Sequence, residues 1–396
     1  MELHFLIFWR ILTMEQLMPP KRKVALFSTS FLPYSQTFIH DEIKAHSDDY
    51  EITVFCKDRQ NEDIFPFDNY YKPKGKLAEK IYQNIAYWPK FDKIFEKEKF
   101  DLVHAHFGTG AVYALPYVKK YKIPFVVTFH GNDVAALVGT QKFQVNRWRY
   151  YLKHKEIFKH ATLLLAASEE LKALLIELGA PASKVQVYRL GIDLSNFRYL
   201  KKSSNKIIEF IMVGRFTPKK GHLYTLNAFK EVIEDRHQAK LTFIGSGELL
   251  SDAKEFVDAN GLSKFVDFRG ILTSDEVIQS LEKADVLIAP SVVAHDQDRE
   301  SGLIVVKEAS SIGLPVIGTW HGGIHEIIDD NVTGFLVPER NIPQLVDKMT
   351  TLIKNPELIC QFGKAGRQKM ESDYDLFEQV KKLEELYEKA ISDSEL

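Results

Sequence analysis

Short runs of apolar and β-branched residues recur along this chain, and each is followed by a longer segment whose apolar residues have helical spacing. Such runs are typical of parallel strands buried on both faces, and their alternation with helices is that of βαβ units. The strands expected in the first half are residues 24–28, 52–56, 102–106, 125–130, 163–167 and 185–190. Those expected in the second half are residues 207–213, 241–244, 266–268, 286–290, 315–318 and 335–337. Two similar α/β modules, each a doubly wound parallel sheet, are therefore expected.

A polar connector at residues 200–205 separates the two sets of strands. Because a chain of 396 residues exceeds the size at which one hydrophobic core stops growing, we expect a first domain at residues 1–195 and a second at residues 196–373. Residues 374–396 are expected to form a final helix. Its apolar stripe consists of Leu376, Phe377, Val380, Leu383 and Tyr387. Residues 1–20 are expected to be disordered, since their short apolar run is interrupted by Arg10 and lacks the flanks of a signal peptide.

The composition excludes several classes of protein. Cys56 and Cys360 are the only cysteines and lie in different halves, so there is no disulfide framework or zinc-ligand spacing, and a reducing cytoplasmic compartment fits. No apolar run approaches the roughly 18 residues of a membrane-spanning helix. The net charge of −2 combines +5 in residues 1–195 with −7 in the remainder. This asymmetry fits an anionic partner of the first half, or an ordinary imbalance between halves.

Two glutamates, Glu300 and Glu308, flank the start of an expected helix after the strand at residues 286–290. Eight helical positions give ~12 Å of rise and ~80° of rotation, so the two carboxylates cannot act as one acid–base pair. They can instead bind two ends of a long ligand, Glu300 the hydroxyls of a sugar and Glu308 those of a ribose. Gly302 and Leu303 would offer unpaired N–H groups at the positive end of the helix, which suits a diphosphate. A solvated helix residue is the alternative interpretation of Glu308.

A basic turn from Gly214 to Gly221 follows the strand at residues 207–213. Fixed Arg and Lys side chains stabilise the charge that develops on a departing phosphate in a water-poor cleft. Arg215 and Lys220 are the candidates for this role, and a plain surface loop is the alternative.

His130 and Asp133 follow the strand at residues 125–130, where side chains face the crevice at the carboxyl end of a parallel sheet. His130 can bond a reacting sugar, and Asp133 can orient an acceptor or a nearby group. A structural hydrogen bond is the alternative for His130. His104 and His106 suggest a metal site, which we reject because no third ligand follows at metal-like spacing.

Gly245, Ser246 and Gly247 follow the strand at residues 241–244 and are similar to a dinucleotide-binding turn. Leu250 occupies the place of the third glycine, and the sequence contains no P-loop. A redox cofactor is therefore not expected.

In this order, the motifs resemble those of glycosyltransferase family 4, retaining enzymes of the GT-B fold, in which two Rossmann-like domains face each other across a cleft. The resemblance spans nearly the whole chain. In the second half it rests on residues 299–302, Glu308, residues 313–316, 321–326 and 333–338. In the first half, residues 30–39, 104–108 and 190–193 resemble the colanic acid and exopolysaccharide branch. One departure is that residues 28–37 contain no glycine, whereas many relatives carry glycines in this loop.

The resemblance implies transfer of a hexose, with retention, from a nucleotide-diphospho-sugar bound by the second domain to an acceptor bound by the first. It implies no cofactor, no metal and no enzyme nucleophile, and a final helix that crosses back onto the first domain. The expected catalytic residues are His130, Arg215, Lys220 and Glu300. The expected donor-binding residues are Gly214, Arg215, Lys220, Gly245, Arg269, Gly270, Glu300, Ser301, Gly302, Leu303 and Glu308. The acceptor side is expected at Ser35, Gln36, Thr37, His106 and Asp133.

The implied acceptor is a polyprenyl-linked glycan, and no nucleic-acid partner is expected. Residues 72–100 hold eight lysines against four acidic residues, and residues 142–160 hold six basic residues against Glu156 alone, with aromatic residues interleaved in both. Basic amphipathic helices of this kind suit the inner face of the plasma membrane, and a solvated helix face is the alternative. Two other functions stay open: a sugar-nucleotide epimerase of the same fold, and a non-catalytic nucleotide-sugar-binding subunit of a polysaccharide assembly complex.

Overall fold

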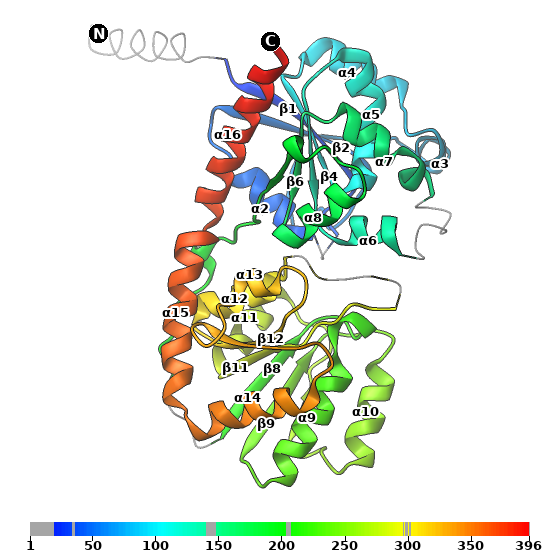
Figure 1. The fold of residues 1–396 in the computed structure, drawn as a ribbon. Helices are drawn as coiled ribbons and strands as arrows, with labels where there is room; N and C mark the ends of the chain where they lie inside the picture. Colours follow the sequence, from blue (N-terminus) through cyan, green and yellow to red (C-terminus); the bar gives the residue numbers. More distant parts are fainter. Residues whose placement is uncertain are drawn as a thin grey trace, which may run out of the picture.

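Two parallel sheets, each with helices on both faces, follow one another along the length of the molecule (Figure 1). The computed structural model describes residues 20–33, 36–139, 148–202, 207–295, 297, 300 and 302–395. The disorder predicted for residues 1–20 therefore concerns residues outside the described set, apart from Pro20.

The first sheet has the strand order β3-β2-β1-β4-β5-β6-β7, with all pairs parallel. Its strands are β1 (Arg22–Phe31), β2 (Tyr50–Arg59), β3 (Tyr70–Tyr71), β4 (Leu102–His106), β5 (Phe125–Phe129), β6 (Leu163–Ala166) and β7 (Val185–Val187). Its helices are α2 (Thr37–Ala45), α3 (Lys76–Ile85), α4 (Pro89–Glu98), α5 (Phe107–Tyr121), α6 (Asn132–Val138), α7 (Trp148–His160) and α8 (Glu169–Glu177). The six predicted strands are confirmed, and β3 was missed because two residues at a sheet edge carry no detectable period.

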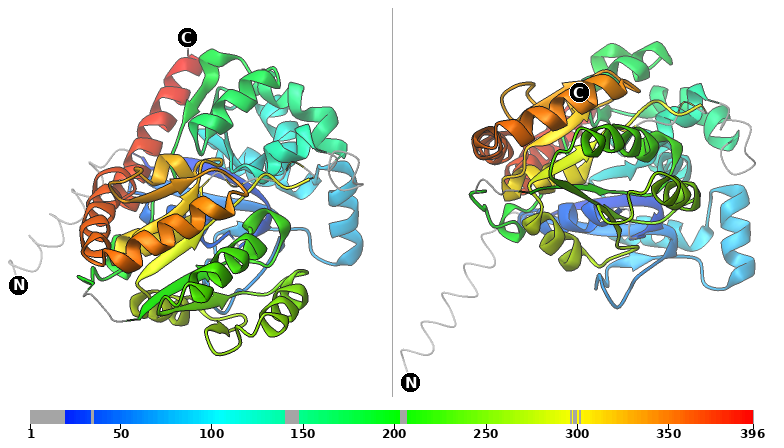
Figure 2. Two further views of the ribbon diagram at one scale, coloured as in Figure 1. Left: turned by 60° about the horizontal axis from the view of Figure 1, so that its bottom comes forward. Right: turned by 90° about the horizontal axis from the view of Figure 1, so that it is seen from below.

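The second sheet has the strand order β10-β9-β8-β11-β12-β13, again parallel throughout. The views in Figure 2 turn this part of the molecule toward the reader. Its strands are β8 (Ile208–Val213), β9 (Ala239–Ile244), β10 (Val266–Phe268), β11 (Val286–Ala289), β12 (Val316–Thr319) and β13 (Gly334–Val337). Its helices are α9 (His222–Glu234), α10 (Leu250–Ala259), α11 (Ser274–Lys283), α12 (Ile304–Ile312), α13 (Ile324–Ile327), α14 (Ile342–Lys354) and α15 (Glu357–Asp373). The predicted strands of this half are also confirmed.

Successive side chains of each central strand point to opposite faces of the sheet and therefore pack in different cores, as the two-residue period of a strand requires. On β1, Phe27 packs under α4 and α5, whereas Leu26 packs in the core beneath α2. On β8, Phe210 and Ile211 divide in the same way between the two cores of the second sheet. Because these strands are buried on both faces, their sequences are continuous runs of apolar residues.

The last helix, α16 (Leu376–Glu395), returns to the first sheet after α15 has passed along the second (Figure 1). Leu383 and Tyr387 are fully buried against α2, β4 and β5. The predicted crossing of the final helix is therefore confirmed. The domain boundaries at residues 195/196 and 373/374 stay predictions.

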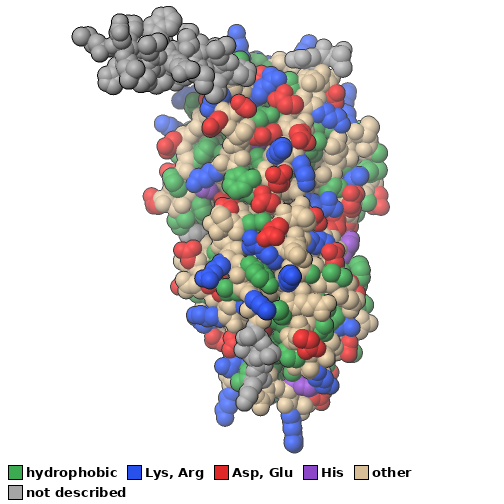
Figure 3. Space-filling model, turned by 90° about the vertical axis from the view of Figure 1, so that its left-hand side faces the viewer, with side chains coloured by type: hydrophobic (Ala, Val, Ile, Leu, Met, Phe, Trp, Pro, Cys, Tyr) green, Lys and Arg blue, Asp and Glu red, His purple; other side chains and the backbone are tan. Residues whose placement is uncertain are grey.

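The chain crosses from one domain to the other twice, near Ile192 and near Asp375, and the two crossings lie side by side. The backbone N–H of Ile192 donates to the carbonyl of Tyr374 at 2.8 Å, and the N–H of Leu376 donates to the carbonyl of Ile192 at 3.0 Å. The two crossings thus pair like a short piece of parallel sheet. On the face along α15 and α16, charged side chains of both signs are interspersed (Figure 3). Among the described residues, no helix has both the length and the apolar composition needed to cross a membrane.

Candidate active site

The predicted site residues lie in the loops at the carboxyl ends of strands from both sheets. One such loop follows β5. Gly131 in this loop has φ 102°, a conformation that favours glycine. Oδ1 of Asp133 accepts the backbone N–H of His130 at 3.1 Å and of Gly131 at 3.0 Å, and Oδ2 accepts that of Gly108 at 2.9 Å. Asp133 is only 3% exposed and positions the loops after β4 and β5, which fits the prediction that it orients a nearby group, and its place on the acceptor side stays a prediction. Burial raises the pKa of Asp133, and these backbone donors act in the opposite direction.

His130 is partly exposed and rests on the buried ring of His106. Nε2 of His130 lies 3.1 Å from Nδ1 of His106, and the two rings are parallel within 13°. Phe38 and Phe107 flank His130, and Phe107 has φ 65°, a strained conformation for a bulky residue. Burial, and then His106 and Lys307, lower the pKa of His130 well below its usual value, so the ring is neutral at pH 7. His106 is 0% exposed and lies behind His130, and its place on the acceptor side stays a prediction.

Gln36 and Thr37 begin α2 directly beside this cluster, since Phe38 contacts His130. Both are partly exposed, and Oε1 of Gln36 has no hydrogen-bond partner among the described residues. Their position is compatible with the predicted acceptor side. Ser35 lies outside the described residues.

The basic turn after β8 is locked to its neighbours by close glycine contacts. Residues Pro218–Lys220 form a short 3-10 helix, and Gly221 follows with φ 78°. A Cβ on Gly221 would lie 2.2 Å from the carbonyl oxygen of Pro290, and one on Gly245 would lie 2.1 Å from that of Gly214. No larger residue fits at either glycine, so the loops after β8, β9 and β11 form one rigid support.

Glu300 lies between two lysines of this turn. Its Oε1 is 3.0 Å from Nζ of Lys220 and 3.4 Å from Nζ of Lys219, and all three side chains are largely buried. Burial would raise the pKa of Glu300, but Lys220 and then Lys219 outweigh it and hold the pKa at about 2. Arg215 is exposed and has no ion-pair partner among the described residues. The structure therefore brings Lys220 and Glu300 together and adds Lys219, and Arg215 lies on the same turn as the two lysines.

The backbone of Glu300 is held by His321, which the sequence did not single out. Nε2 of His321 accepts the N–H of Glu300 at 3.0 Å, and its Nδ1 donates to Oε1 of Glu339 at 2.7 Å. Gly322 has φ 52°, and a Cβ there would lie 1.7 Å from the carbonyl oxygen of Glu300. The only sequence signal for this support was the resemblance of residues 321–326 to the family motif.

The helix that follows Glu300 begins at Ile304, with Leu303 at its N-cap. A helix therefore begins here as predicted, and its first residue comes directly after Leu303. Glu308 is partly exposed, and its carboxylate has no hydrogen-bond partner among the described residues. Burial raises the pKa of Glu308 to about 7. Ser301 lies outside the described residues.

The predicted base-binding segment follows β10. The carbonyl of Gly270 accepts the N–H of Gly245 at 2.7 Å, which joins this segment to the glycine turn after β9. Arg269 is exposed and lies 3.6 Å from Asp267.

Glu42, His104 and His106 form a buried group whose potential ligand atoms lie within 4.8 Å of one another. The sequence argued against a metal site because no third ligand follows the two histidines. In the structure Glu42 of α2 lies at that third position. Both ring nitrogens of His104 are hydrogen-bonded, to the hydroxyls of Tyr387 at 2.7 Å and Thr128 at 2.8 Å. The group is therefore part of a hydrogen-bonded network between α2, α16 and the first sheet.

Comparison with known families extends over both sheets. The family model "Glycosyltransferase Family 4" matches residues 35–196, and "Glycosyl transferases group 1" matches residues 196–369. This chain belongs to the glycosyltransferases. Among curated glycosyltransferases it is 28% identical to the amylovoran biosynthesis glycosyltransferase AmsK of Erwinia amylovora, over 73% of this chain and 70% of the relative. It is also 28% identical to the putative colanic acid biosynthesis glycosyltransferase WcaL of Escherichia coli (strain K12), over 69% and 67%.

A further relative of this glycosyltransferase is the UDP-Gal:alpha-D-GlcNAc-diphosphoundecaprenol alpha-1,3-galactosyltransferase of Escherichia coli, 27% identical over 74% of this chain and 77% of the relative. Among solved structures, Anabaena HepE in complex with UDP matches 93% of this chain and all of its own, with a TM-score of 0.74 and 17% identity. Sucrose-phosphate synthase from Thermosynechococcus elongatus matches 94% of this chain and all of its own, with a TM-score of 0.75 and 19% identity. The GT-B fold is confirmed.

Proposed function

We propose that this glycosyltransferase transfers a hexose, with retention at the anomeric carbon, from a nucleotide-diphospho-sugar to a lipid-linked oligosaccharide. The setting is the synthesis of an exopolysaccharide or another cell-surface polysaccharide, as the names of AmsK and WcaL suggest. The observation that carries the proposal is the charged cluster of Lys219, Lys220 and Glu300, with the exposed Arg215 on the same turn as the two lysines.

The cluster suits the departure of a nucleoside diphosphate. When the bond between sugar and diphosphate breaks, its electron pair stays on the phosphate oxygen, and Arg215 and Lys220 would stabilise that charge. The turn that carries them is rigid, so little reorganisation is needed during the reaction. In this proposal the acceptor hydroxyl attacks from the face that the diphosphate leaves, and the leaving phosphate takes its proton. No enzyme nucleophile and no metal is then needed.

The rest of the donor would lie along α12. Glu300, held by His321, would accept hydrogen bonds from sugar hydroxyls, and the helix N-terminus would face the diphosphate. Glu308 would bind the ribose hydroxyls. The complex of Anabaena HepE with UDP supports a uridine nucleotide as the first donor to test.

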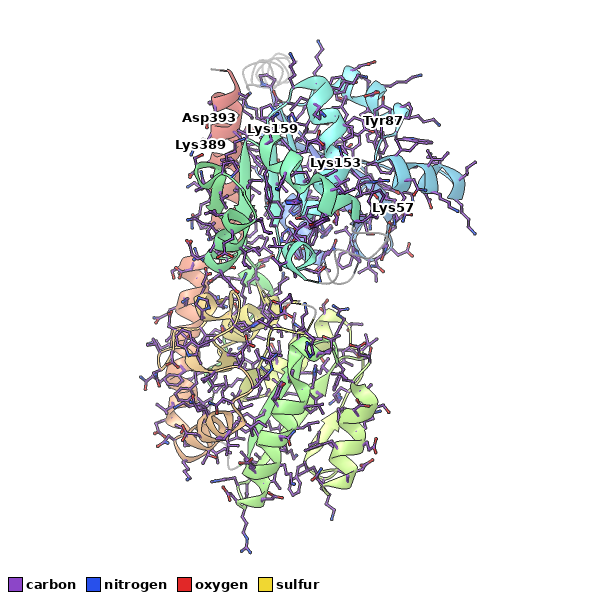
Figure 4. All side chains as sticks on the ribbon, turned by 45° about the vertical axis from the view of Figure 1, so that its right-hand side comes forward. Lys57, Tyr87, Lys153, Lys159, Lys389 and Asp393 are labelled. Carbon is purple, nitrogen blue, oxygen red and sulfur yellow. The ribbon has the colours of Figure 1, made fainter. Side chains whose placement is uncertain are left out.

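The acceptor would reach the first domain from a membrane. On α3, Leu77, Ile81 and Ile85 form an exposed apolar stripe, and Leu77 is 73% exposed. Lysines of the adjacent α7, such as Lys153 and Lys159, lie on the same domain (Figure 4). Apolar side chains with basic neighbours favour binding at the inner membrane face. The diphosphoundecaprenol in the name of the galactosyltransferase relative supports a lipid-linked acceptor.

The decisive experiment is a thermal-shift screen of the full chain against UDP-, GDP-, ADP- and TDP-sugars, with and without EDTA. A ligand that binds the native state raises the melting temperature, so one clear shift that EDTA leaves unchanged would identify the donor class. The anomeric configuration of the product, read by NMR after incubation with that donor, then tests retention.

The same experiments separate the two other functions. An epimerase would convert the bound donor into another nucleotide-sugar in the absence of any acceptor. A non-catalytic subunit would show a thermal shift but neither product. No shift with any nucleotide would refute the proposed function.

A further inference from the structure

One glutamate of the second domain reaches across to the first. Glu326 lies on α13, at the edge of the second domain that faces the first (Figure 1), and its side chain is 10% exposed. Its Oε1 accepts the backbone N–H of Glu169, the first residue of α8, at 2.6 Å, and its Oε2 accepts an N–H of the Arg189 guanidinium at 2.6 Å. The first N–H groups of a helix have no partner within the helix and lie at its positive end, so a carboxylate is favoured there. Glu326 is thus a direct link between the two domains.

The segment that carries Glu326 also holds the backbone of Glu300. Nε2 of His321 accepts the N–H of Glu300 at 3.0 Å, and the N–H of Gly323 donates to the carbonyl of Glu300 at 3.4 Å. Within the segment, the N–H of Ile324 donates to the carbonyl of His321 at 3.0 Å, and that of Glu326 donates to the carbonyl of Gly323 at 3.2 Å. The segment is therefore one short hydrogen-bonded turn, with Glu300 bound at its start and the first domain bound at its end.

Rotation of one domain against the other would break the link to the first domain. The chain connects the domains at the two crossings near Ile192 and Asp375. Glu169 lies on α8, outside both crossings, so a rotation about them changes the distance between Glu169 and Glu326. A hydrogen bond of 2.6 Å tolerates little displacement, because such bonds are lost beyond about 3.5 Å. Opening of the domains would therefore release the end of the turn that the first domain holds.

We propose that Glu326 is a positioning residue that couples closure of the two domains to the placement of Glu300, so that Glu300 is held ready for the sugar of the donor while the domains are closed. The contact of Glu300 with the sugar rests on the proposed function, whereas the link from the first domain to the backbone of Glu300 does not. The sequence indicated residues 321–326 by resemblance alone, which gave Glu326 no role.

The test compares three variants of the full chain with the wild type. Glu326→Met has a similar volume and removes both acceptor atoms. Glu326→Gln keeps an amide oxygen that can accept the N–H of Glu169, but it loses the charge that pairs with Arg189. Glu384→Met is the matched control, because Glu384 of α16 binds the first domain in a similar way, through the backbone N–H of Ser47 at 2.8 Å and through a histidine side chain.

Hydrogen exchange at residue resolution, read by mass spectrometry, tests the link without any ligand. In Glu326→Met we expect the N–H of Glu169 to exchange faster, because its acceptor is gone, and the N–H of Glu300 to exchange roughly tenfold faster, because the turn that holds it is released. Glu326→Gln should give intermediate rates at both. In Glu384→Met, both rates should equal those of the wild type, and the N–H of Ser47 should exchange faster. An unchanged rate at Glu300 in Glu326→Met would overturn the proposal, whether or not the rate at Glu169 changes.

Donor affinity gives the second readout, with UDP-glucose and UDP as the probes in calorimetry. The two ligands differ by the sugar, which Glu300 binds in the proposed function. We expect the dissociation constant of UDP-glucose to rise roughly tenfold in Glu326→Met, the effect of weakened hydrogen bonds to one carboxylate, and to recover partly in Glu326→Gln. The affinity for UDP should stay unchanged, which also shows that each variant folds.

The two readouts separate this proposal from the proposed function. Equal weakening of both ligands in Glu326→Met, or of neither, would refute the coupling to the sugar. Absence of nucleotide binding in the wild type would refute the proposed function alone, because hydrogen exchange still decides whether Glu326 positions Glu300.

Discussion

At the scale of single residues, one carboxylate, that of Glu300, is shared by two lysines of the turn after β8. Glu300 stays ionised because Lys220 and Lys219 lie within 3.4 Å of it. In the proposed function, either lysine would exchange this partner for a phosphate oxygen, and Glu300 would then accept hydrogen bonds from sugar hydroxyls. The two lysines are not equivalent, because the side chain of Lys220 lies against Gly214 at the end of β8.

We expect Lys220→Ala to lower kcat by about 10²–10³-fold, the range for loss of one preorganised group that stabilises developing charge. Nucleotide binding should remain detectable by calorimetry, because the contacts of the base and ribose are untouched. Lys230→Ala is the matched control, since among the described residues Lys230 forms an ion pair with Glu234 of α9 and no other. A Lys220→Ala enzyme with a normal kcat would refute the assigned role.

The raised pKa of Glu308, about 7 because of burial, predicts a pH-dependent donor affinity. Ribose hydroxyls donate more strongly to an ionised carboxylate, so below this pKa binding must first remove a proton. The dissociation constant of UDP-glucose should fall as the pH rises, by up to about tenfold per unit below the pKa, and level off above it. UDP-glucose is the suitable probe because its diphosphate does not titrate in this range.

Calorimetry in buffers with different ionisation enthalpies should detect the released proton. Glu308→Gln should bind more weakly and show no pH dependence of this origin. An equally steep pH dependence in Glu308→Gln would place the titrating group elsewhere.

The sequence singled out charged residues that follow a strand, and the structure places two of them, Lys220 and Glu300, in contact. The contacts of Glu42 and Glu339 could not be predicted, because their partners are brought close only by the fold. His106 was placed at the acceptor side by the resemblance of residues 104–108 to the family motif. Its burial beneath His130 depends on ring packing, and strand position carries no information about that.

At the scale of elements, the apolar runs predicted both sheets because parallel strands are buried on both faces. The edge strand β3 has only two residues, and its pairing with β2 was therefore not detectable. The pairing of the two interdomain crossings was also beyond prediction. It joins residues about 180 positions apart through one Ile192–Asp375 bridge, which has no periodicity of its own.

Gly191 makes that pairing possible. A Cβ at this position would lie 2.5 Å from Cα of Leu376, so Gly191→Ala should push the two crossings apart. We expect a loss of about 1–3 kcal/mol in the free energy of unfolding, the usual cost of overpacking, measured by urea denaturation. Gly366→Ala is the control, because its Cβ would make only ordinary contacts, the nearest at 3.5 Å, inside α15. Equal stabilities of the two variants would contradict the close approach as the reason for Gly191.

At the scale of the whole molecule, the first domain is completed by the last segment of the chain. Leu383, Tyr387 and Ala390 belong to the same core as Leu26 and Val54 of β1 and β2. Full burial of a large apolar side chain contributes about 1.5–3 kcal/mol, so α16 supplies a substantial share of the stability that this face of the sheet needs. The two domains are consequently joined by a structural element as well as by a connector.

Lys307 lies where the parts of the molecule meet, and its titration should be visible in the stability of the whole chain. From α12 of the second sheet, its Nζ donates to the carbonyl of Leu190 at 2.7 Å and lies 4.8 Å from the ring centre of Tyr374. Burial, with Arg189 as the next cause, lowers the pKa of Lys307 from 10.5 to about 7. Between these two values the unfolded chain binds a proton that the folded chain does not, so this group makes stability increase with pH.

The contribution should reach about 1.4 kcal/mol per pH unit within that window and be absent in Lys307→Met. Urea denaturation at a series of pH values above 7 measures it as the difference between the wild type and the variant, which cancels the titration of other groups. Lys230→Met, at a partly exposed position on α9, should give a curve parallel to that of the wild type. Parallel curves for Lys307→Met would mean that the junction admits enough water to keep the lysine charged, and the two domains would then be less tightly closed there than the buried amine indicates.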